Sequence, residues 1–71
     1  MRTLRLSENL KACREERGMS CAQLGSAVGV AREQIWCYEH GEKLPSIQTF
    51  AMICGVLGVT ADALLFGEVG A

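Results

Sequence analysis

The chain has 71 residues and a formal net charge of −1, and 49% of its residues are hydrophobic but only 6% aromatic. This length predicts one domain, residues 1–71, with a thin core, because a domain of about 60 residues buries only about 60% of the surface that its unfolded chain exposes. The charge lacks the basic excess that is usual in nucleic-acid-binding domains, and no apolar run approaches the roughly 18 residues of a membrane span, so we expect no membrane association and a cytoplasmic location.

Apolar residues recur at intervals of three and four along the chain, which predicts helices and no sheet. Five short helices joined by turns are expected over residues 5–17, 20–28, 31–39, 46–57 and 60–66. Thr3 or Ser7 is expected to cap the first helix, and Ser20 with Gln23 forms a capping-box pattern at the start of the second. The buried side of the fourth helix is expected to hold Ile47, Phe50, Ile53, Cys54 and Leu57.

The expected third helix has two contrasting sides. One side carries the residues of a core-facing stripe: Ala31, Gln34, Ile35 and Tyr38. The opposite side carries Arg32, Glu33, Trp36, Cys37 and His40. A solvated side would normally carry lysine and glutamate, whereas this set is better suited to contact with a partner. Two short helices, a turn at Gly29 and a contact surface on the second helix form the helix-turn-helix pattern.

The four cysteines form no CxxC pair and match no zinc-ligand spacing, so no metal site is expected. Free thiols also fit a reducing compartment. The chain contains no set of nucleophile, base and acid, no phosphate-binding glycine loop and no pair of carboxylates placed for catalysis. The sequence therefore predicts neither an enzyme nor a cofactor.

Residues 6–68 resemble the lambda-repressor/Cro type of helix-turn-helix domain, the Xre family. The resemblance rests on the REERG-MS junction at 14–20, on Leu24 with Gly29-Val30, on Ile35 with Tyr38-Glu39 and Gly41, and on the closing segment GVTADALLFG. It implies a compact all-α domain of five helices whose second and third helices form the helix-turn-helix. It also implies a sequence-specific DNA-binding transcriptional regulator that binds double-stranded DNA.

In that family the third helix lies in the major groove of DNA. Carried over position by position, the resemblance implies base contacts at Cys21, Arg32, Glu33, Trp36 and Cys37. It implies phosphate contacts at Ser20, His40, Gly41 and Lys43. It further implies a partly buried ion pair between Arg14 and Glu39, which would tie the first helix to the end of the third.

A homodimer is expected because one recognition helix covers only a few base pairs, and two half-sites one helical turn apart give useful specificity. The expected interface is the C-terminal apolar set: Leu57, Val59, Leu64, Leu65, Phe66 and Val69. The first interpretation is therefore a repressor that binds a palindromic operator as a homodimer.

The sequence departs from the family pattern in the helix-turn-helix. Ala31 stands where serine or threonine usually caps the third helix, at a cost of about 1 kcal/mol. Gly25 stands where alanine is general, at a cost of about 0.5–1 kcal/mol. Trp36 and Cys37 stand where polar residues are usual. These last two put the identity of the contacted bases in question.

Alternatives therefore remain open. Arg32 and Glu33 form either base contacts or a solvated pair, and Trp36 is an isolated exposed residue, a contact for a base or thymine methyl group, or part of a protein interface. Oxidation of Cys21 or Cys37 would block the DNA-facing side, unless both thiols stay reduced with no regulatory role. As a whole, the chain could instead be an antitoxin-type regulator or a protein-interaction module with weak or no operator binding.

Overall fold

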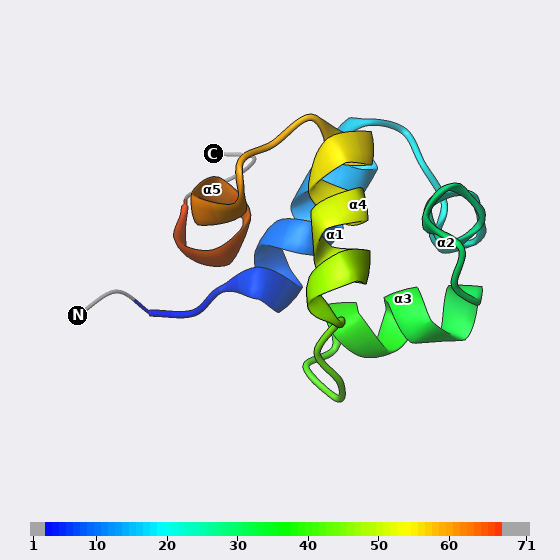
Figure 1. The fold of residues 1–71 in the computed structure, drawn as a ribbon, viewed down its shortest axis with the longest axis horizontal. Helices are drawn as coiled ribbons and strands as arrows, with labels where there is room; N and C mark the ends of the chain where they lie inside the picture. The colour runs from blue at the N-terminus through cyan, green and yellow to red at the C-terminus, as the bar shows by residue number, and fades with distance from the viewer. Residues whose placement is uncertain (1–2, 68–71) are drawn as a thin grey trace.

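The computed structural model describes residues 3–67, which form five helices and contain no strand. They are α1 (Leu6–Glu16), α2 (Cys21–Val28), α3 (Arg32–Glu39), α4 (Ile47–Leu57) and α5 (Ala61–Phe66). In Figure 1, α1 and α4 lie at the centre, α2 and α3 lie on one side of them and α5 lies on the other. The prediction of a five-helix, all-α fold with a helix-turn-helix at the second and third helices is confirmed.

Helix α2 is capped at both of its ends. Ser20 and Gln23 form a capping box, in which the Gln23 N–H donates to Ser20 Oγ at 3.0 Å and the Ser20 N–H donates to Gln23 Oε1 at 2.8 Å. Gly29 ends the helix in the left-handed conformation, with φ of 79°, which glycine adopts without a steric cost. The turn between α2 and α3 therefore has the conformation that a helix-turn-helix needs.

Gly25 allows a close contact between α2 and the backbone at the start of α3. A Cβ atom added to Gly25 would lie 2.6 Å from the carbonyl oxygen of Val30 and 3.3 Å from the backbone nitrogen of Arg32. Both neighbouring atoms belong to the backbone, so a methyl group here would require the turn to move. The glycine weakens α2 as a helix but lets α2 pack directly against the start of α3.

Two helices begin without a side-chain cap. The N-cap of α3 is Ala31, which has no side-chain oxygen, so the first turn of α3 lacks this contribution. The N-cap of α1 is Arg5, and the expectation that Thr3 or Ser7 caps this helix is wrong, because Ser7 already lies within its first turn. The Arg5 N–H instead donates to the carbonyl oxygen of Leu65 at 2.7 Å, which joins the start of α1 to α5.

All five helices contribute to one hydrophobic core. Its members are Leu6, Leu10, Cys13, Leu24, Val28, Ile35, Tyr38, Ile53, Leu57 and Leu64. Ile47 was expected in the buried stripe of α4, but it is 85% exposed. It occupies the first turn of α4, where it lies on the rim of an apolar hollow. The predicted buried side of α4 is therefore the right one, but the rest of the chain covers it only after the first turn of the helix.

Asn9 is a buried polar residue in this otherwise apolar interior, with 2% of its surface exposed. Its side-chain Nδ2 lies 3.0 Å from the carbonyl oxygen of Leu64, 2.9 Å from that of Gly67 and 3.3 Å from that of Ala63. The last carbonyl groups of a helix have no partner within the helix. Asn9 supplies the missing donors and thereby connects α1 to the end of α5.

Candidate nucleic-acid interface

Helix α3 is anchored along one side and exposed along the other. Ile35 is fully buried and Tyr38 is 6% exposed, so this side is fixed in the core. On the opposite side, 72% of the Arg32 side chain and 74% of the Glu33 side chain are exposed. Trp36, one turn further along, is 46% exposed. The exposed side of α3 therefore combines a cation, a carboxylate and a large aromatic ring on a fixed support.

Arg32 and Glu33 lie in the first turn of α3. Arg32 Nε and Glu33 Oε2 are 3.4 Å apart, a long contact between two largely exposed side chains. A hydrogen bond from its own backbone N–H lowers the pKa of Glu33, and the hydrogen bond from Arg32 lowers this pKa further. The guanidinium can donate to the O6 and N7 atoms of guanine, and a carboxylate can accept from the N4 amino group of cytosine. Both groups are charged and accessible for such contacts.

His40 lies against Trp36 on the surface of α3. Its ring stacks on the ring of Trp36, with centroids 3.8 Å apart and an angle of 16° between the planes. His40 Nδ1 also lies 2.8 Å from the carbonyl oxygen of Trp36. Because a carbonyl oxygen only accepts, Nδ1 is the donor of this hydrogen bond. The His40 ring therefore supports Trp36, and its contact with a phosphate stays a prediction.

The two cysteines expected to contact bases have different surroundings. Cys21 is half-buried and packs against the core, and its Sγ lies 4.0 Å from Glu39 Oε1. The thiol thus has a contact with Glu39 inside the chain, and its contact with a base stays a prediction. Cys37 is half-buried on α3 and remains a candidate on that helix. Of the other phosphate candidates, Ser20, Gly41 and Lys43 are exposed.

A buried ion pair fixes the end of α3. Arg14 Nε donates to Glu39 Oε2 at 2.6 Å, and Arg14 Nη2 donates to Glu39 Oε1 at 3.0 Å. Arg14 Nη1 donates to the carbonyl oxygen of Met19 at 2.7 Å. The hydrogen bond with Glu39 raises the pKa of Arg14. One guanidinium therefore joins α1, the segment before α2 and the end of α3.

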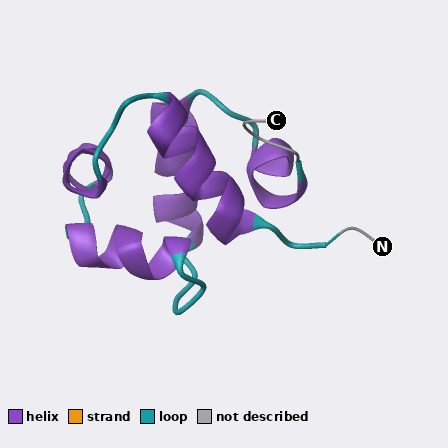
Figure 2. Ribbon diagram, turned by 180° about the vertical axis from the view of Figure 1, so that it is seen from behind, coloured by secondary structure: helices purple, strands orange, loops and turns teal. Residues whose placement is uncertain are grey.

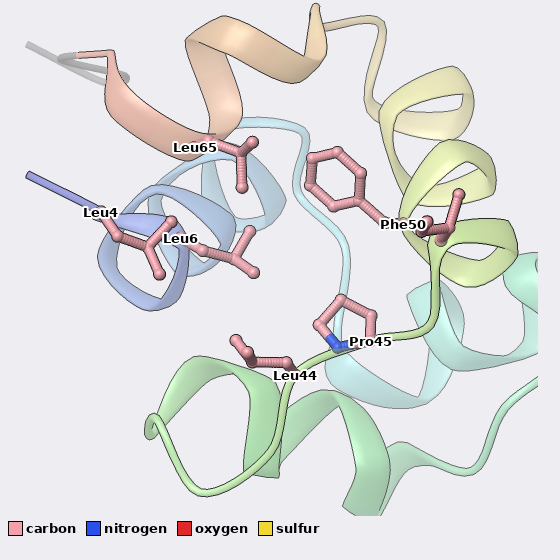
Figure 3. A pocket seen from close by; sticks show the side chains of 7 residues that line it. Leu4, Leu6, Leu44, Pro45, Phe50 and Leu65 are labelled. Atoms are coloured by element: carbon pink, nitrogen blue, oxygen red, sulfur yellow. The ribbon is translucent and has the colours of Figure 1, made fainter. Parts of the chain in front are cut away.

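An apolar hollow lies between the N-terminal segment, the α3–α4 loop, α4 and α5 (Figure 3). It has a volume of about 220 Å³ and is lined by Leu4, Leu6, Leu44, Pro45, Ile47, Phe50 and Leu65. Three residues of its lining are well exposed: Leu4 by 53%, Leu44 by 71% and Ile47 by 85%. Leu44 and Leu4 were not singled out from the sequence. Leu44 could have been found from the sequence, because it is an apolar residue in the loop before Pro45, where the periodicity of a helix does not account for it.

The expected dimer interface needs a correction. Leu57 is 1% exposed and Leu64 is fully buried, so both belong to the core of one chain and cannot cover a partner. Leu64 docks the short helix α5 on the core, whereas Leu65 lines the hollow. Val59, Leu65 and Phe66 are half-buried, and Val69 lies outside the described residues.

Residues 3–67 offer neither a membrane-spanning helix nor a cluster of metal-ligating side chains. No helix in this range is both long and apolar enough to cross a bilayer. No group of three or more histidine, cysteine, aspartate or glutamate side chains in the same range is arranged to hold a metal ion.

Comparison with known proteins places this geometry in a family. Residues 5–65 match the family model described as a helix-turn-helix domain. The HTH-type transcriptional regulator YqaE of Bacillus subtilis (strain 168) is 36% identical over 62 residues, which cover 87% of this chain and 53% of that protein. The chain spans about half the length of the curated relatives it matches, 53% and 56% of the first two.

Two solved structures extend the comparison. The P22 c2 repressor in complex with a synthetic operator has a TM-score of 0.86 and 29% identity, and the match covers 93% of this chain and 100% of that one. The biofilm regulator SinR in complex with DNA has a TM-score of 0.77 and 30% identity, covering 84% of this chain and 97% of that one. The chain therefore belongs to the helix-turn-helix domain family and has the lambda-repressor-like fold.

Proposed function

We propose that this chain is the DNA-binding part of a transcriptional regulator and that α3 lies in the major groove. The observation that carries the proposal is the exposed side of α3, which presents Arg32, Glu33 and Trp36 on a helix fixed from behind by the core. The N-terminal residues of a recognition helix contact base edges, and Arg32 and Glu33 occupy that turn. The similar P22 c2 repressor and SinR domains were both solved with DNA.

The net charge of −1 supplies no long-range attraction to DNA, so we infer that a small number of local phosphate contacts support this binding. We propose Lys43, the exposed backbone at Gly41 and the N-terminal turn of α2 at Ser20, since backbone N–H groups at a helix start attract phosphate. With so few contacts, affinity for non-specific DNA will be modest. Specific contacts from α3 then account for a large share of the binding free energy.

We further propose that two copies bind together through the apolar hollow. Leu44 and Pro45 belong to the α3–α4 loop, which extends past the end of α3 (Figure 2). Two copies that meet at this loop on a two-fold axis present both α3 helices to one side, as two half-sites about 34–36 Å apart require. The exposed apolar side chains around the hollow, including Ile47, would then be covered by the same residues of the second copy.

The small size of this surface indicates when the dimer forms. A stable protein interface buries about 800 Å² on each partner, whereas three well-exposed apolar side chains supply only a few hundred Å² on the scale of side-chain burial. The dimer should therefore be weak in free solution and form on DNA. It would bind a palindromic operator, and we propose that it acts as a repressor by excluding other proteins from that site.

A second function is favoured by the same unusual residues. The net acidic charge and the exposed indole of Trp36 also suit a module that binds another protein, in the manner of an antitoxin. Such a module would bind DNA weakly or not at all. Binding to DNA therefore separates the two functions.

The test is selection of bound duplexes from a random DNA pool, followed by titration of the selected sequence with matched variants. Arg32→Ala should weaken binding about 10-fold or more, as expected for a base contact worth about 1–3 kcal/mol. Arg17→Ala is the matched control, because Arg17 carries the same charge but lies beside Gly58, at the end of α4 that is far from α3 (Figure 1). This variant should change the affinity for the selected sequence little. A pool with no enriched sequence, or equal losses in both variants, would refute recognition by α3.

A further inference from the structure

The exposed side of α3 carries a pair of stacked rings, which the resemblance to the Xre family does not explain. Trp36 and His40 lie four residues apart, so they are neighbours on the helix surface. Their ring centroids are 3.8 Å apart, and the planes are nearly parallel, at 16°. His40 Nδ1 is also 2.8 Å from the carbonyl oxygen of Trp36. The imidazole is thus held by the backbone and the ring of the same residue.

We propose that His40 is a positioning residue that holds the Trp36 indole for contact with the methyl group of a thymine in the major groove. This rests on the proposed function, in which α3 enters that groove. Stacking covers one side of the indole, yet 46% of Trp36 remains exposed. The uncovered part of the ring is held in one orientation before any partner arrives.

The chemistry of the uncovered indole selects the partner. An indole ring is apolar except for its single N–H donor. Among the groups that base pairs present in the major groove, the thymine methyl is the apolar one, and it is contacted by apolar side chains. Arg32 and Glu33 lie one turn nearer the start of α3 and suit the polar edges of guanine and cytosine. Trp36 would therefore specify a thymine beside the base pairs that Arg32 and Glu33 contact.

Prior fixation of the ring explains why His40 matters without touching DNA. A free side chain loses rotamer freedom when it is held at an interface, and that loss weakens binding. The stack with His40 imposes much of this restriction in the unbound protein. Removal of the imidazole should therefore weaken the thymine contact and leave the contacts of Arg32 unchanged.

Deoxyuridine provides a direct test, because it lacks only the methyl group of thymine. Each thymine of the selected operator is replaced in turn, and the affinity of the full chain is measured. For the wild type, one position in each half-site should show about fourfold weaker binding, the equivalent of one buried methyl group. Trp36→Ala should bind both duplexes equally at that position. His40→Ala should lose most of the difference, and His40→Phe, which keeps a flat ring for stacking, should restore it.

Fluorescence gives a readout that does not depend on DNA. Trp36 is the single tryptophan of the chain, so quenching of its emission by acrylamide reports its accessibility. Quenching should increase in His40→Ala and return towards the wild-type value in His40→Phe. Equal quenching in all three proteins would overturn the positioning role.

The DNA results separate this proposal from the function on which it rests. If the wild type binds its selected operator but every deoxyuridine duplex binds equally well, the thymine contact is refuted and DNA recognition stands. The same conclusion follows if Trp36→Ala retains the full difference. If the wild type binds no duplex, both the contact and the proposed function fail.

Discussion

Arg14 and Glu39 form a two-pronged ion pair with distances of 2.6 and 3.0 Å, although α1 and α3 are separate elements of the chain. Only 12% of the Arg14 side chain and 2% of the Glu39 side chain are exposed. Glu39 is the last residue of α3, so the pair fixes the end of this helix relative to α1. The orientation of the proposed recognition helix thus depends on a contact outside the DNA-facing side.

Removal of one partner of the Arg14–Glu39 pair should lower the free energy of unfolding strongly. Glu39→Gln leaves the guanidinium of Arg14 without its counter-charge, and we expect a loss of about 3 kcal/mol in the free energy of unfolding, measured by urea denaturation. Glu33→Gln removes the same charge at an exposed position and should change stability little. A double variant, Arg14→Met with Glu39→Leu, should be more stable than either single variant. Equal stability of Glu39→Gln and Glu33→Gln would contradict the structural role of the pair.

Asn9→Ala should destabilise the chain by about 1–3 kcal/mol, because carbonyl groups at the end of α5 lose their buried donor. The measurement is thermal or urea unfolding. Gln48→Ala removes an exposed amide on α4 and serves as the control. If the two variants unfold alike, the connection between α1 and α5 does not depend on Asn9.

One buried thiol and one half-buried thiol make stability dependent on pH. Desolvation by burial raises the pKa of Cys13, and the charge of Glu16 adds to this effect; burial likewise raises the pKa of Cys54. A raised pKa in the folded state means that folding opposes ionisation, so this part of the stability is present below the ordinary value of 9.0 and is lost as pH rises above it. Urea unfolding between pH 8 and 10 should show the decrease. A Cys13→Ala, Cys54→Ala double variant with the same decrease would contradict this origin.

The hollow can be tested by placing a charge on its rim. Ile47→Glu should leave the free energy of unfolding nearly unchanged, since Ile47 is 85% exposed, but should abolish cooperative binding to a duplex with two half-sites. Met52→Glu places the same charge on α4 outside the lining of the hollow and should retain cooperativity. Gel-shift titrations on one and two half-sites provide the comparison. Cooperative binding by Ile47→Glu would exclude this surface as the contact between copies.

Local chemistry made the fold predictable, and the limits of prediction have a physical cause. The capping box of Ser20 and Gln23 and the buried stripe with Ile35 depend on neighbours within one or two turns. Which turn of a helix is covered depends on the packing of distant segments. Periodicity therefore placed Ile47 on the correct side of α4 without revealing its exposure, and it could not separate core residues such as Leu64 from surface residues.

In the candidate site too, local spacing predicts some features, whereas others depend on distant contacts. The exposure of Arg32 and Trp36 follows from helical spacing, which was visible in the sequence. The contact of Cys21 with Glu39 joins residues that lie 18 positions apart, which helical spacing cannot reveal. The spacing of Trp36 and His40 permitted a contact, but their stacking depends on side-chain conformations that spacing does not specify.

The most direct test of the proposed DNA binding is the affinity of the chain for duplex DNA as a function of salt. A protein that binds phosphates releases counterions, so its affinity must fall as salt rises. We predict at least about a tenfold loss between 50 and 200 mM salt for random duplex, as expected for a few phosphate contacts, with tighter binding to the selected operator at every concentration. Absence of duplex binding at low salt, or an affinity that does not change with salt, would contradict the proposed function.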